Sequence, residues 1–246
     1  MGEDFEIFFD HALPRFAPPN VQVYHARSRR GVACLAYVCD RMTVPRRSAS
    51  EKYASFQNTS MPRLLARGIA VSPEGVERYC FVYENTLGNP VVAGQGEVQA
   101  YGWRPDLVIQ GVIKPLAALL QEFHNADMVH GGIRASNLFD GGTLPLQRVI
   151  VGDCLSGTYL SAQPELYLPP PIALAHPMGR GLGTPEEDMY ALGVTCAVLL
   201  RTQDPFAGKT SEELMVHKID LGTLSTLIEN ERLPSNFLEM LRGVLH

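Results

Sequence analysis

Two polar side chains near the middle of the sequence have types and spacing that could bind a metal ion and phosphates. Asn137 lies in the segment VHGGIRASNLF, residues 129–139, and Asp153 ends the run RVIVGD, residues 148–153. Amide and carboxylate oxygens such as those of Asn137 and Asp153 would satisfy Mg²⁺ together with phosphates and water. The alternative is structural: Asn137 ties the loop together and Asp153 caps a turn. The residues alone leave both interpretations open.

The cysteines and a second histidine have simpler explanations. Cys34 and Cys39 lie five residues apart in a predicted strand and therefore on opposite faces, so we expect buried core thiols and no metal site. Cys154, next to Asp153, is either a reactive thiol or, as we expect, a small buried hydrophobic residue. His124 fits the end of a helix.

Six arginines between residues 27 and 47 could form a basic docking patch for an acidic partner or anionic lipid headgroups. The alternative is a solvated hairpin edge, where charges block the addition of another strand. These residues are Arg27, Arg29, Arg30, Arg41, Arg46 and Arg47.

The composition indicates one large domain or two lobes with a real hydrophobic core. The chain has 246 residues, 46% of them hydrophobic, and a formal net charge of −5, which argues against disorder and against a nucleic-acid-binding protein. Five cysteines without a CxxC pair favour reduced thiols, and we expect a cytoplasmic protein. The Ala-, Arg-, Leu- and Pro-rich composition suggests a bacterial source.

Neither a signal peptide nor a membrane span is expected in this sequence. The N-terminus has no basic region before an apolar one, and the longest apolar run, residues 189–200, is shorter than the roughly 20 residues that a bilayer span needs. We therefore expect a membrane link only through regions outside this chain.

The first third of the sequence is typical of an antiparallel sheet, because short β-type runs follow one another without long helices. A hairpin turn is expected at residues 27–31. The runs lie at 21–24, 32–39, 68–72 and 78–83.

The remainder of the sequence is predicted to be helical. Residues 107–123 show helical spacing, although Pro115 should kink or restart that helix. A second helix is expected to begin at Thr184, with Pro185 and Glu187 completing a capping box, and to run to about Arg201 in the middle of the domain. Shorter surface helices are expected at 211–218 and 236–244, after a long Pro- and Gly-rich segment at 161–183.

The order of these features resembles that of eukaryotic-type (Ser/Thr) protein kinases. Residues 130–137 resemble the catalytic loop His-Arg-Asp-Leu-Lys-Pro-x-Asn, and Asp153 matches the Asp of the metal-binding Asp-Phe-Gly. Residues 188–194, DMYALGV, resemble the start of the kinase central helix, and residues 200–206 resemble its usual ending. Glu84 begins a segment, ENTLG, that resembles the hinge between the two kinase lobes.

The residues that carry kinase chemistry are largely replaced. Gly132 stands where the resemblance implies the catalytic carboxylate, and a lost general base typically costs about 10²–10⁴ in rate. Gly131 replaces the Arg that pairs with a phosphorylated activation segment, and Arg134 replaces the catalytic-loop Lys. The segment that should end Ala-Pro-Glu is Pro-Pro-Pro, residues 169–171.

The first lobe shows the same loss. No Gly-x-Gly-x-x-Gly precedes Val21, and the segment before it, residues 13–20, contains prolines without the N–H groups that cradle phosphates. The strand at 32–39 has no Lys, and Tyr37 or a neighbour occupies that place. Glu51 is the only acid in the poorly defined helix region, and without a Lys partner it is expected on the surface.

The resemblance implies an α+β, two-lobed protein-kinase-like fold, with an antiparallel β N-lobe at 1–86, a mainly helical C-lobe at 87–246 and the last C-lobe helix absent. We expect a pseudokinase that binds protein partners as a regulatory or scaffold module, with the segment 154–183 as one contact. The alternative is an atypical Ser/Thr kinase that retains ATP and Mg²⁺ at a degenerate site; a small-molecule phosphotransferase is a third class. That site would comprise Asn137, Asp153 and Glu84, with no catalytic residue, and with His130 and Asp188 structural.

Overall fold

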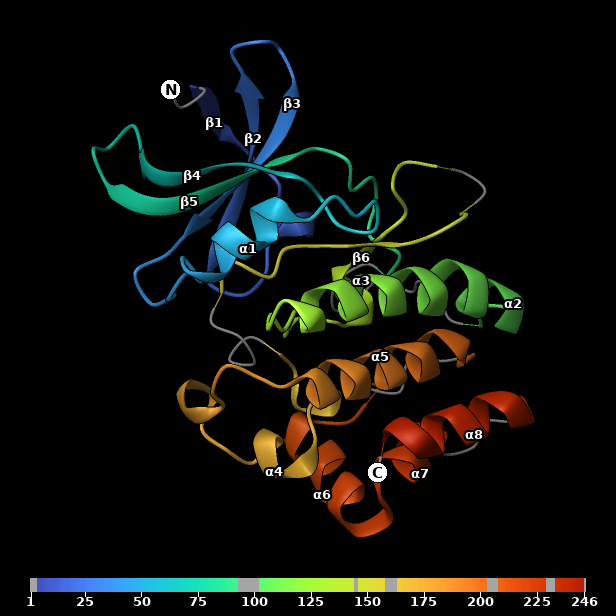
Figure 1. Cartoon of the computed structure of the whole chain (residues 1–246). Coiled ribbons are helices and arrows are strands. Elements are labelled where there is room, and N and C mark those ends of the chain that lie inside the picture. Colours follow the sequence, from blue (N-terminus) through green and yellow to red (C-terminus); the bar gives the residue numbers. More distant parts are fainter. Residues whose placement is uncertain are drawn as a thin grey trace.

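The computed structural model describes residues 4–92, 102–143, 146–157, 163–202, 208–228 and 233–245. The first lobe is a five-stranded antiparallel sheet in the order β1-β2-β3-β5-β4 (Figure 1). The strands are β1 (Phe5–Ala12), β2 (Val21–Ser28), β3 (Ala33–Cys39), β4 (Leu64–Val71) and β5 (Glu77–Glu84).

The two faces of this sheet carry different side chains, as strand alternation requires. On β3, Leu35, Tyr37 and Cys39 point to the inner face, which joins the main hydrophobic core with the helical lobe. Cys34 and Cys80 point to the outer face, in a separate apolar cluster. Cys34 and Cys39 are both buried and on opposite faces, as the sequence predicts.

One strand and two short helices were not predicted. β1 pairs with β2 from Phe5 to Ile7 and again at Ala12, with an irregularity between them. A seven-residue helix, α1 (Ala49–Ser55), follows β3 in the region 48–59, where the kinase resemblance implies a reduced and poorly defined helix. The helical lobe also contains α4 (Pro170–Ala173) and α7 (Thr223–Ile228), neither of which has a strong sequence signal.

The second lobe is mainly helical, with short 3-10 turns and a two-stranded ribbon next to the cleft. The remaining helices are α2 (Pro105–Val108), α3 (Lys114–Asn125), α5 (Pro185–Leu200), α6 (Ser211–Leu221) and α8 (Ser235–Val244). The ribbon pairs β6 (Leu138–Phe139) with β7 (Ile150–Val151), and the 3-10 turns described in this lobe are η3 (Ala135–Asn137), η5 (Glu165–Tyr167) and η6 (Pro177–Gly179). A further 3-10 turn, η1 (Pro14–Phe16), lies in the first lobe between β1 and β2.

The helix restart expected at Pro115 occurs through a π-helical turn. A π-helical turn, η2 (Ile109–Ile113), separates α2 from α3, which begins at Lys114. Pro115 has no N–H to donate to the carbonyl of Gly111, four residues earlier. That carbonyl instead accepts a hydrogen bond from the N–H of Val149 at 2.7 Å. This hydrogen bond connects the long helical region to the segment that leads through β7 to Asp153.

The central helix α5 is buried along most of its length. Thr184 and Glu187 form the predicted capping box at its N-terminus, and every residue from Tyr190 to Leu200 is buried. Figure 1 shows α5 between α3 and α8. Gly193 permits the close approach of α8, because a Cβ there would lie 2.6 Å from a methyl carbon of Val244. The N-terminal turn of α5 is thus held in a fixed position facing residues 129–139.

Within the described residues, no helix combines the length and the apolar character needed to cross a membrane. The apolar run at 189–200 belongs to α5, inside the helical lobe, as predicted from its length.

Candidate functional site: the remnant catalytic loop and the cleft

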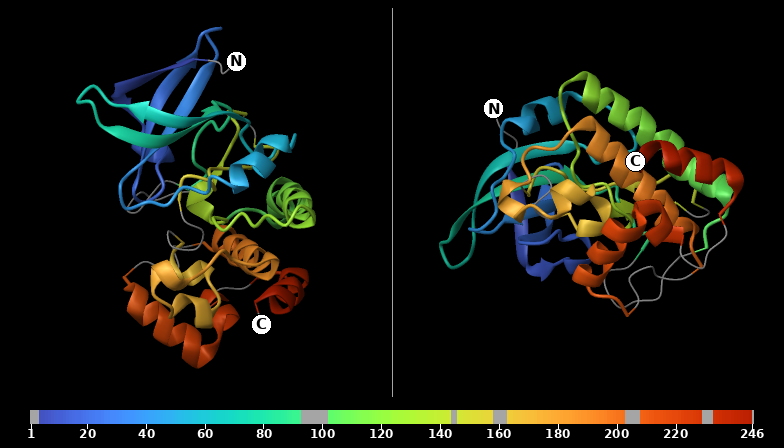
Figure 2. Two further views of the ribbon diagram at one scale, coloured as in Figure 1. Left: turned by 60° about the vertical axis from the view of Figure 1, so that its left-hand side comes forward. Right: turned by 90° about the horizontal axis from the view of Figure 1, so that it is seen from below.

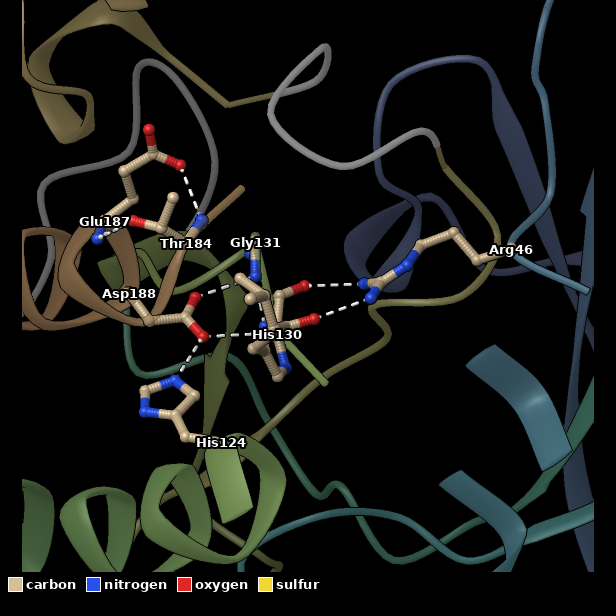
Figure 3. A network of polar contacts seen from close by, with 9 residues as sticks. Arg46, His124, His130, Gly131, Thr184, Glu187 and Asp188 are labelled. Atoms are coloured by element: carbon tan, nitrogen blue, oxygen red, sulfur yellow. Dashed lines mark hydrogen bonds and ion pairs between the residues drawn. The ribbon is translucent and has the colours of Figure 1, made fainter. Parts of the chain in front are cut away.

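Asp188, in the first turn of α5, organises the loop at residues 129–139 (Figure 3). Its carboxylate accepts hydrogen bonds from the backbone N–H groups of His130 and Gly131, both at 2.8 Å. His124, at the end of α3, places its Nε2 atom 3.0 Å from the same carboxylate. Asp188 is only 1% exposed, so two main-chain donors and an imidazole satisfy a fully desolvated charge.

His130 is held inside the lobe as a neutral imidazole. Its Nδ1 atom accepts a hydrogen bond from the N–H of Gly132 at 3.2 Å, and its ring stacks on Phe123 with centroids 6.1 Å apart. Burial lowers the pKa of His130 to about 4, although Asp188 opposes that shift. An imidazole with this pKa is a poor general base at neutral pH.

Gly132 lies at the position where the kinase resemblance implies a carboxylate. A Cβ at this residue would lie 3.5 Å from both Asn137 Nδ2 and the ring of His130, an ordinary van der Waals distance. These two residues contribute all three of the heavy atoms closest to that point, and neither is an acid. The loop therefore has room for a Cβ here, and none of the three nearest heavy atoms belongs to a carboxylate.

Asn137, at the end of η3, joins the loop to the segment that follows β7. Its Nδ2 atom donates to the carbonyl of Gly132 at 2.9 Å and to the carbonyl of Asp153 at 3.3 Å. The backbone of Gly152 lies so close that a Cβ there would collide with Asn137 Oδ1. This arrangement corresponds to the tying role that the sequence leaves open for Asn137.

Asp153 is 7% exposed and is fully engaged in hydrogen bonds within the protein. Its carboxylate accepts from the N–H of Leu155 at 3.0 Å, from the N–H of Ser156 at 3.1 Å and from the Ser156 hydroxyl. Tyr83, at the end of β5, donates its hydroxyl to Asp153 at 2.5 Å. Two amides and two hydroxyls thus occupy the oxygens that could bind a metal ion, an arrangement that matches turn capping. No cluster of three or more His, Cys, Asp or Glu side chains suited to a metal occurs among the described residues.

Buried aromatic side chains pack where the sheet meets the helical lobe. Tyr37, at or next to the place expected for the Lys, is 1% exposed and packs edge-on against Tyr83 with centroids 5.3 Å apart. Phe16, in the turn η1 between β1 and β2, stacks on Phe139 of β6 at 5.4 Å. Phe16 is 5% exposed and Phe139 1%. The segment before β2, where the kinase resemblance implies a phosphate-binding loop, thus packs a ring against the helical lobe.

The hinge-like segment after β5 is also internally bonded. The N–H of Thr86 donates to the carbonyl of Glu84 at 3.0 Å. The Glu84 carboxylate, proposed from sequence as part of a nucleotide site, lies 3.0 Å from Nε of Arg63. Glu51, on α1, is exposed as expected but has a partner, because Arg67 of β4 lies 3.2 Å from its carboxylate.

Arg46 corrects the prediction of an exposed basic patch. Its guanidinium is buried and donates to the carbonyls of His130 at 2.9 Å, Val129 at 2.6 Å and Cys154 at 2.7 Å. Figure 3 shows the Arg46 guanidinium pointing toward His130. Its backbone N–H also donates to the carbonyl of Leu155 at 2.8 Å. Arg46 therefore clamps the loop after β3 to both the 129–139 loop and the residues after Asp153.

The other arginines do not gather into one patch either. Arg27, Arg29 and Arg30 lie at the β2–β3 turn, whereas Arg41 and Arg47 follow the opposite end of β3. Arg29 pairs with Asp4, and Arg47 lies over the ring of Tyr79 at 4.3 Å. The seven residues of β3 separate the two groups, so arginines that are close in the sequence lie at opposite ends of a strand.

Buried cations hold the segment that begins at Gln163. Arg180 is 6% exposed and pairs with Glu165 at 3.1 Å. Lys218, on α6, is 1% exposed and donates to the carbonyls of Glu165, Leu166 and Leu168. The helix expected on the surface at 211–218 is therefore anchored by a buried lysine next to the triple proline. Figure 2 shows α4 and α6 side by side in both views.

Arg134 and Cys154 are the two remaining candidates from the sequence. Arg134 donates to the side chain of Gln163 at 3.1 Å, and Gln163 donates to the carbonyl of Ile133 at 2.7 Å. Burial raises the pKa of the Cys154 thiol far above its usual range, so Cys154 is a buried hydrophobic residue and not a reactive thiolate.

Sequence comparison and structural comparison give different results. No family model and no curated protein matches the chain. Among solved structures, the chain is similar to Rad53 residues 1–466 in complex with AMP-PNP, with a TM-score of 0.59 and 16% sequence identity. The alignment covers 99% of this chain and 60% of that chain. This similarity shows that the chain has a protein-kinase-like fold.

Proposed function

We propose that this chain is a pseudokinase: a protein-kinase-like module with little or no phosphotransfer that acts by binding protein partners. The observation that carries the proposal is the packing of three aromatic residues between the lobes. Phe16, Tyr37 and Phe139 are each at most 5% exposed, and Phe16 stacks on Phe139 across the lobe boundary. By the kinase resemblance, a nucleotide would bind near these residues, and its entry would require buried aromatic surface to become exposed.

The electrostatics of the cleft support the same conclusion. Phosphoryl transfer relies on cations that neutralise the phosphates and on a carboxylate near the acceptor hydroxyl. Tyr37 brings no charge to the place expected for the lysine, and Gly132 brings no carboxylate. Asp153 already accepts hydrogen bonds from Tyr83 and Ser156, so a metal ion would have to displace these donors before it could bind.

Exposed apolar side chains support a role in protein binding. Leu174, Met178 and Leu182 are 67%, 63% and 70% exposed, and all lie within the altered segment at 154–183. Arg180, in the same segment, is buried and fixes the backbone near them. Large apolar side chains that are exposed close together on an anchored segment are typical of protein-interaction sites.

Thermal unfolding with ATP and Mg²⁺ or Mn²⁺ tests the absence of nucleotide binding. A ligand that binds only the folded state raises the unfolding midpoint, so we expect no rise beyond that produced by inorganic triphosphate at equal ionic strength. Incubation with radiolabelled ATP and a general acceptor protein should give no transfer. A metal-dependent rise that Asp153→Ala abolishes would contradict the proposal and favour an atypical kinase that retains ATP.

The variant Phe16→Ala is compared with the wild type in the same thermal-unfolding experiment. The substitution removes the ring that stacks on Phe139 and should cost about 3 kcal/mol of stability, because Phe16 is almost fully buried. If the aromatic ring alone excludes the nucleotide, this variant will gain a midpoint shift with ATP that the wild type lacks. We expect no such gain, since the charges that would hold the phosphates are still missing.

A further inference from the structure

The outer edge of β4 has no neighbouring strand in the part of the chain that the structure describes. Within that part, β4 lies at one end of the sheet order and pairs with β5 alone. Among the described residues, no backbone hydrogen bond links Leu64–Val71 to any other segment. A row of donors and acceptors with strand spacing is therefore available to another strand.

The β4 edge lacks the features that usually prevent strand addition. Leu64–Val71 contains no Lys, Pro or acid, and its only charge, Arg67, is held by Ser50 and Glu51. Ile69 and Val71 are 58% and 57% exposed, large β-branched side chains at the end of an edge strand. Protected edges in proteins carry charges, prolines or bulges. Beyond Ala66, β4 has no proline and no bulge, and its one charge, Arg67, is paired within the chain.

The opposite edge of the same sheet is protected. β1 breaks its register with β2 between Ile7 and Ala12 and exposes Glu6 and Asp10. An interrupted, acidic strand is a poor template for pairing. The comparison singles out β4 as the edge that can accept a partner.

A cavity of about 540 Å³ lies alongside this edge, on the outer face of the sheet. Its walls are the first half of β1 and six consecutive residues of β4, 66–71, and Cys80 and Val82 of β5 also line it. A Cβ on Gly68 would have nothing within 4 Å, so main chain is accessible from the cavity. Glycine within a strand often marks the close approach of another backbone.

The charges around the cavity are already neutralised within the chain. Asp4 pairs with Arg29 on the β1 side, and Arg67 pairs with Glu51 on the β4 side. A charged side chain entering the cavity would lose hydration without finding a free counter-charge. The cavity therefore favours an occupant whose side chains are uncharged.

We propose that the β4 edge binds an extended, uncharged segment of a partner protein as an added sixth strand. Main-chain hydrogen bonds to β4 would supply affinity, and every second side chain would face the cavity beside Gly68 and Val82. The strand offers eight residues, or about 26 Å, for pairing. This inference deepens the proposed role in protein binding by naming a site and the conformation of the partner.

The probe is a dye-labelled, acetylated and amidated octapeptide of alternating threonine and valine, added to the full chain. We expect it to bind and to slow hydrogen exchange at the amides of residues 64–71. The double variant Ile69→Lys/Val71→Lys places charges on the edge and should weaken binding by roughly tenfold or more. Gly68→Val should also weaken binding, because the valine side chain fills part of the cavity. Valine is favourable in β-strands, so the substitution should not weaken β4 itself.

Val216→Lys/Ile219→Lys is the matched control, because these α6 residues are 51% and 52% exposed and lie in the other lobe. This control should bind the peptide as the wild type does. Equal loss in both double variants, or no protection of 64–71, would overturn the proposal. Protection that rises with protein concentration before peptide is added would assign the edge to a second copy and overturn it too. The ATP experiment uses a separate readout, so either proposal can fail alone.

Discussion

The contact between the lobes and the 129–139 loop differ in the side chains that they use. In the loop, Asp188 and Asn137 bind main-chain groups and keep the positions that the kinase resemblance implies. Between the lobes, Tyr37 and Phe16 contribute buried aromatic rings where that resemblance implies a lysine and a glycine-rich loop. The comparison teaches that a protein-kinase-like fold can form the polar contacts that hold this loop without the charged groups that phosphoryl transfer needs.

Removing the Asp188 carboxylate tests the loop half of this comparison and should have the largest effect. Asp188→Ala leaves two buried N–H groups and His124 without their acceptor, so we expect a loss of about 4 kcal/mol of unfolding free energy. Urea denaturation measures it. Asp188→Asn retains one acceptor oxygen and should lose clearly less unfolding free energy than the alanine variant. A change below about 1 kcal/mol for the alanine variant would show that the loop does not depend on this anchor.

Acidification tests the same loop through His130. The folded protein holds His130 neutral with a pKa of about 4, whereas the unfolded chain has a pKa near 6.5. The unfolded state therefore binds more protons between these values, and stability falls as the pH drops from about 6.5 to 4, by about 3 kcal/mol in all.

Denaturation of the wild type and of His130→Gln across this pH range isolates the contribution of the histidine, because the carboxylates titrate in both proteins. The curves should converge as the pH falls. Parallel curves would mean that His130 does not titrate on unfolding, and the description of a desolvated neutral ring would be wrong.

Gly132→Asp tests the other half of the comparison, the missing charged groups of phosphoryl transfer, and should have the smallest effect. The loop has room for a Cβ at this position, so we expect a stability change below about 1 kcal/mol. Restoring the carboxylate should not restore phosphotransfer, because Tyr37 and Phe16 still stand where the resemblance implies a lysine and a glycine-rich loop. Transfer of radiolabelled phosphate by this variant would show that Gly132 alone separates the protein from activity.

The parts of the fold that could be predicted from sequence depend on local chemistry. Thr184 and Glu187 lie three residues apart and form their capping box wherever the helix is placed. The effect of Pro115 follows from a missing N–H. The alternation at 32–39 assigns Cys34 and Cys39 to opposite faces without any knowledge of what each face contacts.

The features that could not be predicted depend on residues far apart in the sequence. Arg46 lies among five other arginines, and only the fold brings it to the carbonyls of residues 129, 130 and 154. Phe16 sits in a proline-rich turn, and its partner Phe139 is more than a hundred residues away. β1 was missed because its irregular stretch before Ala12 breaks the two-residue period.

The Arg46 clamp also bears on how the protein could be divided. If the polypeptide were cut between β5 and α2, the N-terminal piece would carry the Arg46 guanidinium, while the carbonyls of residues 129, 130 and 154 would remain on the other piece. The C-terminal piece would in turn present these carbonyls to solvent. We therefore expect that neither fragment folds on its own and that the two lobes must be expressed together.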